Sequence, residues 1–557
     1  MKRRAMRVVP WALASLELGL LCAGEVRAQS APDAGALRQR LEREQVPAAA
    51  PMRSPTPMRQ GAMVPPEEPD GVVVRGFRFQ GNRLLPDERL AAALGGYIGR
   101  AYGLKGLREA AAAVARVYRE AGWLVRVDLP AQDVSQGHVT LVVVEATFGG
   151  VVVEEPLPRH IDTPWLKRQL QGRLVLGEPI RAEEVDRSLL LSRDLAGVSV
   201  GGALRAGERS GETVLAASVQ DGPRVAGDIS LDNTGSRSTG AERVASNLSL
   251  ASPARWGDRL NLNLMQARGT RLGQMDYQVP LGGQGARLNL GLSRMTYRVI
   301  SPELVSLGSR GASSSLSVGL RYPWIRSQRL SLHGTVGTDW RDFLNEANAT
   351  IQSRYGVTTL SLGAALDWTD ELGEGGQTVA SLTWTEGQTH RRAGDPGNNP
   401  LLDDRFDKVR WALNRQQRLS EALSVSMSLA GQHSGGTLES SERFSLGGAS
   451  GVRAYPSGEG QGSSGWLGSV ELRFRPTADG SLAVFADQGG VHNRDDSPSY
   501  GLRGWGVTGQ WGDRSGWGVR MTCARRQGRN PNPSSTGTDQ DGSLVRNRCW
   551  AFLSKTL

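Results

Sequence analysis

The ten residues TLSLGAALDW (359–368) alternate between apolar side chains and mostly small or polar ones. Successive side chains of a strand point to opposite faces, so Leu360, Leu362 and Leu366 would share one apolar face. The same two-residue period recurs in the C-terminal part of the chain, in LNLNLM (260–265), LSVGLRY (316–322) and LSVSMSLA (423–430). This pattern predicts a sheet with one apolar and one polar face.

Residues 223–557 keep this alternation and predict a mainly β fold, a transmembrane antiparallel β-barrel. At roughly 20 residues per strand with its connection, the segment holds about 16 strands. A soluble sandwich would bury the apolar face, whereas a transmembrane barrel turns it toward lipid and keeps a polar lumen. The length of the segment, its strand number and the 14 Trp residues of the chain favour the barrel.

The N-terminus predicts an exported protein. Residues 1–28 are interpreted as a signal peptide, with a basic start, an apolar run and a small residue, Ala28, before the cut. Cys22 raises the alternative of a lipoprotein, but Leu21 is too large for the usual lipoprotein pattern. Export across a bacterial inner membrane agrees with a barrel in the outer membrane.

Two cysteines, Cys523 and Cys549, remain after signal-peptide cleavage. They lie on the last two predicted strands, and a hairpin centred near Thr536 would place them opposite each other. Two states stay open for this pair. An exported protein permits a disulfide, and the alternative is two free thiols on the lipid face.

The segment between the signal peptide and the first folded unit has two parts. Residues 29–45 predict a short polar helix in which Leu37 and Leu41 lie one turn apart among charged side chains. This apolar face is too small to fold onto a core by itself, so the helix needs a polar cavity or a partner. Residues 46–70 contain seven prolines and predict an extended linker.

Two similar α/β units precede the barrel. Residues 71–147 predict the order strand, helix, helix, strand, strand, and residues 148–222 repeat that order more loosely. In the second helix of the first unit, Leu107, Ala111 and Val114 recur at helical spacing. Tandem copies of one supersecondary unit indicate a modular binding arm.

Four segments carry a resemblance to a known family. They are LPAQDVSQGHVTLVVVEATFG (129–149), LLLSRDLAGVSVGGALRAGERSGETVLAASVQ (189–220), ISLDNTGSRSTGAERVASNLSLASPARWGDRLNL (229–262) and YQVPLGGQGARLNLGLS (277–293). With them the chain resembles the outer-membrane transporters of two-partner secretion systems, relatives of the haemolysin and filamentous-haemagglutinin exporters. The resemblance implies two periplasmic POTRA domains (71–147 and 148–222), a lumenal plug helix (29–45) and a barrel (223–557).

The stretch FSLGGASGVRAYPSGEGQGSSGW (444–466) resembles the family's sixth extracellular loop, which folds back into the barrel. The family core is Val-Arg-Gly-aromatic, and here it reads Val452-Arg453-Ala454-Tyr455. Because alanine replaces glycine at 454, we expect no positive φ at that position.

The strand SLAVFADQGGV (481–491) provides the expected partner of this loop. Leu482 and Val484 fall on the apolar face, so Phe485 and Asp487 fall on the lumenal one. The stretch also resembles the family's Phe-x-Asp motif. We predict a charge-assisted, bidentate Arg453–Asp487 hydrogen bond that locks loop to wall, and the alternative is an outer loop in which Arg453 touches only water.

No sequence motif of an enzyme occurs here in the structural setting that its chemistry requires. Residues 460–465 satisfy G-x-G-x-x-G without opening a helix after a strand, and the six histidines are scattered. We expect no enzyme activity, no cofactor and no metal. The net charge of +10 does not indicate nucleic acid, a poor partner for an exported protein.

The resemblance implies an outer-membrane pore with its POTRA domains in the periplasm. Such a pore would capture an unfolded secreted protein there and export it to the cell surface without ATP. The implied partners are a large exoprotein with an N-terminal secretion domain, outer-membrane lipid and periplasmic chaperones. Two alternatives stay open, a barrel-assembly factor of the same superfamily and a general porin.

Overall fold

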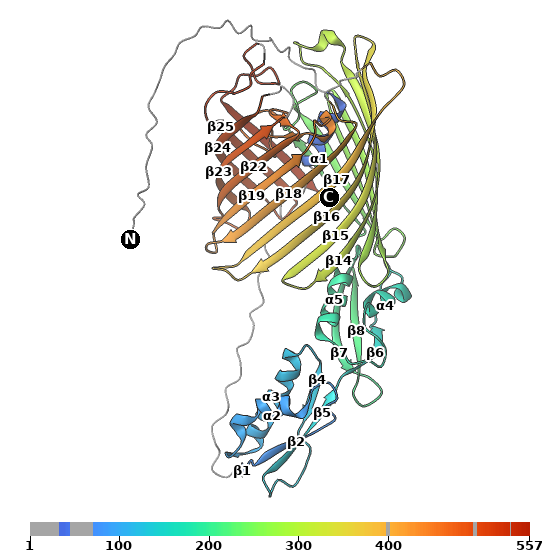
Figure 1. Cartoon of the computed structure of the whole chain (residues 1–557), viewed down its shortest axis with the longest axis vertical. Coiled ribbons are helices and arrows are strands. Elements are labelled where there is room, and N and C mark those ends of the chain that lie inside the picture. The colour runs from blue at the N-terminus through green and yellow to red at the C-terminus, as the bar shows by residue number, and fades with distance from the viewer. Residues whose placement is uncertain (1–32, 45–70, 397–401, 494–497, 535) are drawn as a thin grey trace, which may run out of the picture.

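A computed structural model describes residues 33–44, 71–396, 402–493, 498–534 and 536–557 (Figure 1). The predicted signal peptide (1–28), the proline-rich linker (46–70) and both ends of the predicted plug helix (29–45) lie outside the described residues. In the described ranges, no helix has both the length and the apolar character needed to cross a membrane.

The C-terminal part of the chain forms a closed barrel of 16 antiparallel strands, as the alternation predicted. Its strands are β9 (Val225–Asp232), β10 (Arg243–Ala251), β11 (Arg259–Ala267), β12 (Thr270–Leu281), β13 (Ala286–Arg298), β14 (Arg310–Arg326), β15 (Leu330–Ala347), β16 (Thr350–Asp370), β17 (Gly376–Arg391), β18 (Arg405–Arg418), β19 (Leu423–Ser434), β22 (Ser464–Phe474), β23 (Gly480–His492), β24 (Tyr500–Gly512), β25 (Trp517–Arg526) and β26 (Asn547–Thr556). Leu360, Leu362 and Trp368 of β16 are exposed on the outer face, where they meet lipid.

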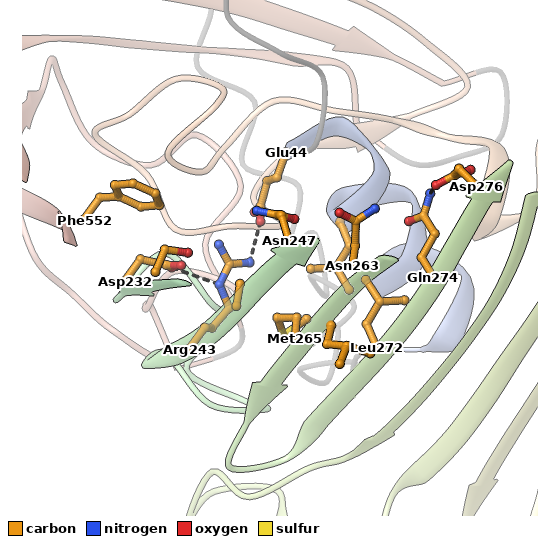
Figure 2. A pocket seen from close by; sticks show the side chains of 14 residues that line it. Glu44, Asp232, Arg243, Asn247, Asn263, Met265, Leu272, Gln274, Asp276 and Phe552 are labelled. Carbon is orange, nitrogen blue, oxygen red and sulfur yellow. Dashed lines mark hydrogen bonds and ion pairs between the residues drawn. The ribbon is translucent and has the colours of Figure 1, made fainter. Parts of the chain in front are cut away.

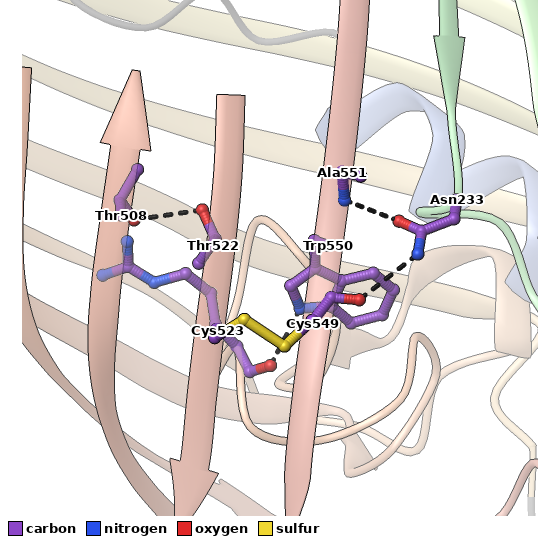
Figure 3. The surroundings of a disulfide bond; sticks show 8 residues. Asn233, Thr508, Thr522, Cys523, Cys549, Trp550 and Ala551 are labelled. Carbon is purple, nitrogen blue, oxygen red and sulfur yellow. Dashed lines mark hydrogen bonds between the residues drawn. A yellow bond between two sulfur atoms is a disulfide. The ribbon is translucent and has the colours of Figure 1, made fainter. Parts of the chain in front are cut away.

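The barrel closes between its last and first strands. β26 pairs with β9 over five residues, from Phe552–Asp232 to Thr556–Asp228, fewer than any other pair of neighbouring barrel strands. Beyond the Phe552–Asp232 pair, the Asn233 side chain continues the contact by accepting from the Ala551 amide at 2.8 Å and donating to the Cys549 carbonyl at 3.3 Å (Figure 3).

The last two strands carry the two cysteines side by side. Cys523 of β25 and Cys549 of β26 are direct partners in the strand register, and a disulfide joins them (Figure 3). Thr522 precedes Cys523, Trp550 follows Cys549, and both are buried on the inner face. Because side chains alternate along a strand, the disulfide lies on the outer face. Of the two states left open by the sequence, the structure contains the disulfide.

Two α/β units precede the barrel. The first has the sheet order β2 (Gly76–Gln80), β5 (His138–Glu145), β4 (Val125–Asp128), with helices α2 (Asp87–Ala93) and α3 (Leu104–Glu120). The second has the order β6 (Thr147–Val153), β8 (Glu212–Asp221), β7 (Val198–Ala206), with α4 (Thr163–Gln171) and α5 (Ala182–Arg193). In both units the first strand is parallel and the third antiparallel to the middle one, so the repeat extends to topology.

One predicted strand is divided in two. The first strand predicted for residues 71–147 is two strands in the structure, because β1 (Val72–Val73) pairs with β3 (Ala101–Tyr102) and β2 starts only at Gly76. The reason is a change of partner, since the Val74 amide donates to Arg100 and the Arg75 amide to Gly137.

The second α/β unit is docked on the periplasmic turns of the barrel, below β14 (Figure 1). Arg326, at the end of β14, donates two hydrogen bonds to the carboxylate of Asp194, at 3.0 and 2.8 Å. Arg287 of β13 donates to the Asp194 carbonyl at 2.9 Å. These contacts place the unit to one side of the barrel mouth.

Candidate functional site

A long loop between β19 and β22 folds into the lumen of the barrel, and we call residues 435–463 the inward loop. It contains the short helix η3 (Ser440–Glu442) and a hairpin of β20 (Phe444–Ser445) and β21 (Gln461–Gly462). Leu446, Val452 and Ala454 are completely buried, which an outer loop would not allow.

The structure brings together all five residues predicted for the loop-to-wall contact. Arg453 donates to both carboxylate oxygens of Asp487, from Nε at 2.9 Å and from Nη2 at 2.7 Å. Its backbone amide donates to the same carboxylate at 3.0 Å. The guanidinium lies 3.3 Å from the ring centroid of Phe485, and Val452 and Tyr455 are buried beside it. The contact between the guanidinium and the carboxylate is therefore bidentate.

The wall supplies three further partners of Arg453 that the sequence analysis missed. Nη1 donates to Glu471 at 3.1 Å and Nη2 to the Ser469 hydroxyl at 3.0 Å. The Arg453 carbonyl accepts from the Trp550 indole at 2.9 Å. A signal for Glu471 was present in the sequence, because its neighbours Val470 and Leu472 are apolar and alternation then turns Glu471 inward.

Alanine at position 454 fits between loop and wall because the residue that faces it on the wall is a glycine. Ala454 is not among the residues with positive φ, in agreement with the sequence. Its Cβ lies 2.6 Å from the position that a Cβ on Gly504 of β24 would take. Gly504 therefore permits the close approach of loop and wall.

The tip of the inward loop is tied to the last extracellular loop, residues 527–546. Glu459 is completely buried, and its carboxylate accepts from Asn530 at 2.7 Å and from the backbone amide of Gln540 at 2.9 Å. Arg526 forms a buried ion pair with Asp539 and lies over the Tyr455 ring. Two extracellular loops are thus packed together in the barrel.

The start of the inward loop has a separate ionic anchor on other strands. Glu442 is completely buried and pairs with Lys408 of β18 and, at 2.7 Å, with Arg341 of β15. Gln432 of β19 donates to the backbone carbonyls of both Glu442 and Ser463, at 2.9 and 2.8 Å. The loop is therefore held at its start on one wall and at Arg453 on another.

The helix predicted as a plug lies inside the barrel, at the end away from the α/β units (Figure 1). α1 (Ala34–Glu44) begins after Asp33, whose carboxylate accepts from the Ala36 amide and from the Ser440 hydroxyl of the inward loop, both at 2.8 Å. A Cβ on Gly35 would lie 2.7 Å from the hydroxyl oxygens of Ser440 and Tyr355. Only glycine fits this contact.

The sequence left open whether the helix lies in a polar cavity or packs on a partner, and its N-terminal half packs on an apolar partner surface. Ala34 and Leu37 pack in an apolar cluster with residues of the barrel wall and loops, namely Met295, Tyr297, Val299, Leu304, Phe343, Tyr355, Val357, Phe406 and Leu438. These lumenal aromatic residues were not distinguished in the sequence, because they interrupt the polar face only near the extracellular ends of four strands.

The C-terminal half of α1 makes polar contacts instead. Arg43 donates to the backbone carbonyls of Ser445 and Gly447 in the inward loop. Glu44 pairs with Arg243 of β10 at 2.5 Å, and Arg243 pairs in turn with Asp232 of β9 at 2.9 Å. Figure 2 shows this chain of charges at the edge of a lumenal cavity of about 460 Å³ between the helix and strands β9–β12.

These features define a class of protein. A barrel with a lipid-facing outer surface, two α/β units of which the second is docked on the barrel turns, and a lumen occupied by a helix and an inward loop is an outer-membrane barrel with a periplasmic arm. Within the described ranges, no group of three or more His, Cys, Asp or Glu residues is placed to hold a metal ion.

Comparison with known proteins identifies the family. The chain belongs to the family of haemolysin secretion/activation proteins ShlB/FhaC/HecB, whose model matches residues 211–510. A second model, the ShlB-type POTRA domain, matches residues 72–146, which form the first α/β unit. The family consists of two-partner secretion transporters of the outer membrane, and their POTRA domains lie in the periplasm.

Individual relatives agree with this assignment. The heme/hemopexin transporter protein HuxB of Haemophilus influenzae (strain 86-028NP) is 26% identical over 488 residues, 84% of this chain and 85% of the relative. The outer membrane transporter CdiB of Dickeya dadantii (strain 3937) is 22% identical over 452 residues, 78% of this chain and 79% of the relative. The solved structure of CdiB from Escherichia coli has the same fold, with a TM-score of 0.69, 19% identity and coverage of 93% of this chain and 95% of that one.

Proposed function

We propose that this outer-membrane transporter captures an unfolded secreted protein in the periplasm and passes it through the barrel lumen without ATP. The observation that carries the proposal is the lumen itself, which is filled by two segments, α1 and the inward loop, held there by side-chain contacts. Segments held in this way can leave and return, so the same lumen can be closed at rest and open during transport.

Capture would use the free edges of the POTRA sheets. β7 is an edge strand, and its residues 202–206 are exposed on both faces. An extended client can add to such an edge through backbone hydrogen bonds, with little demand on its sequence. Folding of the client outside the cell would then make its passage directional. Transport in this way needs no ATP, and the sequence has no nucleotide-binding loop.

The client in this proposal is a large exoprotein with an N-terminal secretion domain. Family membership supports this class of client over the small solutes of a general porin. Periplasmic chaperones and outer-membrane lipid complete the set of proposed partners. No enzyme activity is part of the proposal.

The five residues of the loop-to-wall lock, Val452, Arg453, Tyr455, Phe485 and Asp487, would keep the inward loop in one position in the lumen. Their role is mechanical, because a bidentate arginine–carboxylate contact fixes both distance and orientation. The Glu442 anchor would act with them at the start of the loop.

Secretion of a large exoprotein with an N-terminal secretion domain, sought among the reading frames beside the one for this chain, tests the proposed function. Cells with the full chain are expected to release it, whereas cells lacking residues 71–146 should retain it in the periplasm although a heat-modifiable barrel still inserts. Secretion by the deletion variant would remove the capture role. No secretion by the full chain would remove the function itself.

The plug assignment has its own test. Deleting residues 31–45 should raise single-channel conductance in planar bilayers, because α1 no longer obstructs the lumen. Unchanged conductance would remove the assignment of this helix as a plug.

A further inference from the structure

The outer wall of the barrel contains a hollow of about 520 Å³ across strands β10–β13. It faces lipid, since Val244 and Leu264 in its lining are exposed on the apolar outer face. The outward residues that line it are Val244, Ser246, Leu264, Gln266, Arg271, Gly273, Arg294 and Thr296. The hollow exists because Ser246 and Gly273 are small, and the space beside Gly273 meets only a methyl group of Leu264 at 3.7 Å.

The hollow lies at the extracellular edge of the apolar band. β12 starts at Thr270 after a tight turn, and its other end leads to the turn at 282–285, which contacts the periplasmic unit. Leu264 and Leu292 are outward and apolar, and Arg271 and Arg294 are the outward positions just beyond them. In an outer membrane this height is occupied by the headgroups of the outer leaflet.

The two arginines have no partner among the residues that the structure describes. The side chains of Arg271 and Arg294 make no hydrogen bond, ion pair or ring contact with the described residues, and both are exposed. Other outward arginines nearby are satisfied within the protein: Arg310 of β14 pairs with Glu346 at 2.6 Å, and Arg298 donates to the Arg268 carbonyl. The same face also carries one carboxylate, that of Glu242. The two arginines outnumber it, so the net charge of this part of the outer surface is positive.

We propose that this hollow binds a phosphorylated glycolipid of the outer leaflet, with its phosphate on Arg271 and Arg294 and an acyl chain on Val244, Leu264 and Gly273. Guanidinium groups match phosphate in charge and in the geometry of their paired donors. Clustered basic residues at a membrane surface attract anionic headgroups, and each raises the affinity roughly fivefold. The apolar floor below the arginines fits the acyl chain, so charge and hydrophobic surface select the same molecule.

Diphosphoryl lipid A is a suitable probe, with binding to the full chain in detergent measured by native mass spectrometry. Replacing both arginines, Arg271→Gln with Arg294→Gln, should weaken binding by about tenfold or more. Arg310→Gln is the matched control, because it removes an outward arginine that already has a partner, and it should leave binding unchanged. Heat-modifiable mobility reports that each barrel is folded.

Two further measurements distinguish a lipid phosphate from free inorganic phosphate as the anion that binds. Lipid A without phosphates should bind the full chain at least tenfold more weakly than the diphosphoryl form, a comparison that needs no variant. Inorganic phosphate should not displace lipid A. Equal binding of both lipids, equal binding by the double variant, or displacement by inorganic phosphate would each overturn the proposal. If the double variant does not fold, the single variants replace it, and each should lose part of the affinity.

Discussion

Replacing Arg453 by alanine should release the inward loop from the barrel wall. Asp487 has a completely buried side chain and would lose its cation, while it keeps the Ser469 hydroxyl at 2.8 Å and the backbone amide of residue 453 at 3.0 Å. Breaking a buried ion pair costs about 3–5 kcal/mol, and the two remaining donors place this case near 3 kcal/mol. At about 1.4 kcal/mol per factor of ten, the ratio of inward to released loop should fall about a hundredfold.

Labelling of a cysteine in the loop measures this change. In a Ser450→Cys background, a bulky membrane-impermeant maleimide applied to whole cells should react faster once Arg453 is replaced, because the loop leaves the lumen. The matched control is Arg473→Ala, which removes a second partner of Glu471 (2.6 Å) on the same wall. Its side chain is one-third exposed, so the pair contributes less than about 1 kcal/mol and labelling should not change.

The double variant Arg453→Ala with Asp487→Ala tests whether the two residues act as one unit. Residues in direct contact are not additive, so the double variant should label little faster than either single variant. Secretion should fall in all three while the barrel still inserts. Labelling no faster in Arg453→Ala than in Arg473→Ala, or a double effect equal to the sum of the single ones, would refute the lock.

Three further predictions concern other parts of the molecule. Gly35→Val should raise single-channel conductance, because a Cβ at this position would lie 2.7 Å from hydroxyl oxygens of the inward loop and of β16; unchanged conductance would contradict the close fit. Mass spectrometry without reductant should find Cys523 and Cys549 joined, and Cys523→Ser should lower the temperature at which the heat-modifiable form unfolds, since disulfides typically contribute about 2–4 kcal/mol. Asp194→Asn should increase hydrogen exchange in α5, because Arg326 loses its charged partner; equal exchange would show that the POTRA unit is held by other contacts.

The barrel could be predicted because its signal is local. Leu360 and Leu362 reveal the outer face of β16 without any knowledge of the neighbouring strands, and the strand number follows from length. The Arg453–Asp487 contact needed two additional facts, the resemblance of the loop and the side on which Asp487 falls. Alternation alone would have placed Asp487 in the lumen without naming its partner.

The Glu442 anchor could not be found in the same way. Glu442 lies 34 residues from Lys408 and about three times as far from Arg341, on different elements. Alternation shows which charged side chains face the lumen, but not which of them pair. Only the closure of the barrel brings Glu442, Lys408 and Arg341 together. The break between β1 and β2 escaped for a similar reason, since it depends on partners at Arg100 and Gly137.

The helix α1, which we propose as the plug, is held by contacts of two physical kinds, and they respond to different conditions. Packing of Ala34 and Leu37 on the apolar cluster of the barrel wall and loops loses strength on cooling, because hydrophobic burial weakens at low temperature. The Glu44–Arg243 pair is partly reached by water and loses strength as dissolved salt screens its charges. Cold and dissolved salt therefore loosen opposite ends of the same helix. Under the proposed plug role, the conductance of the resting barrel would then vary with the temperature and salinity of the habitat.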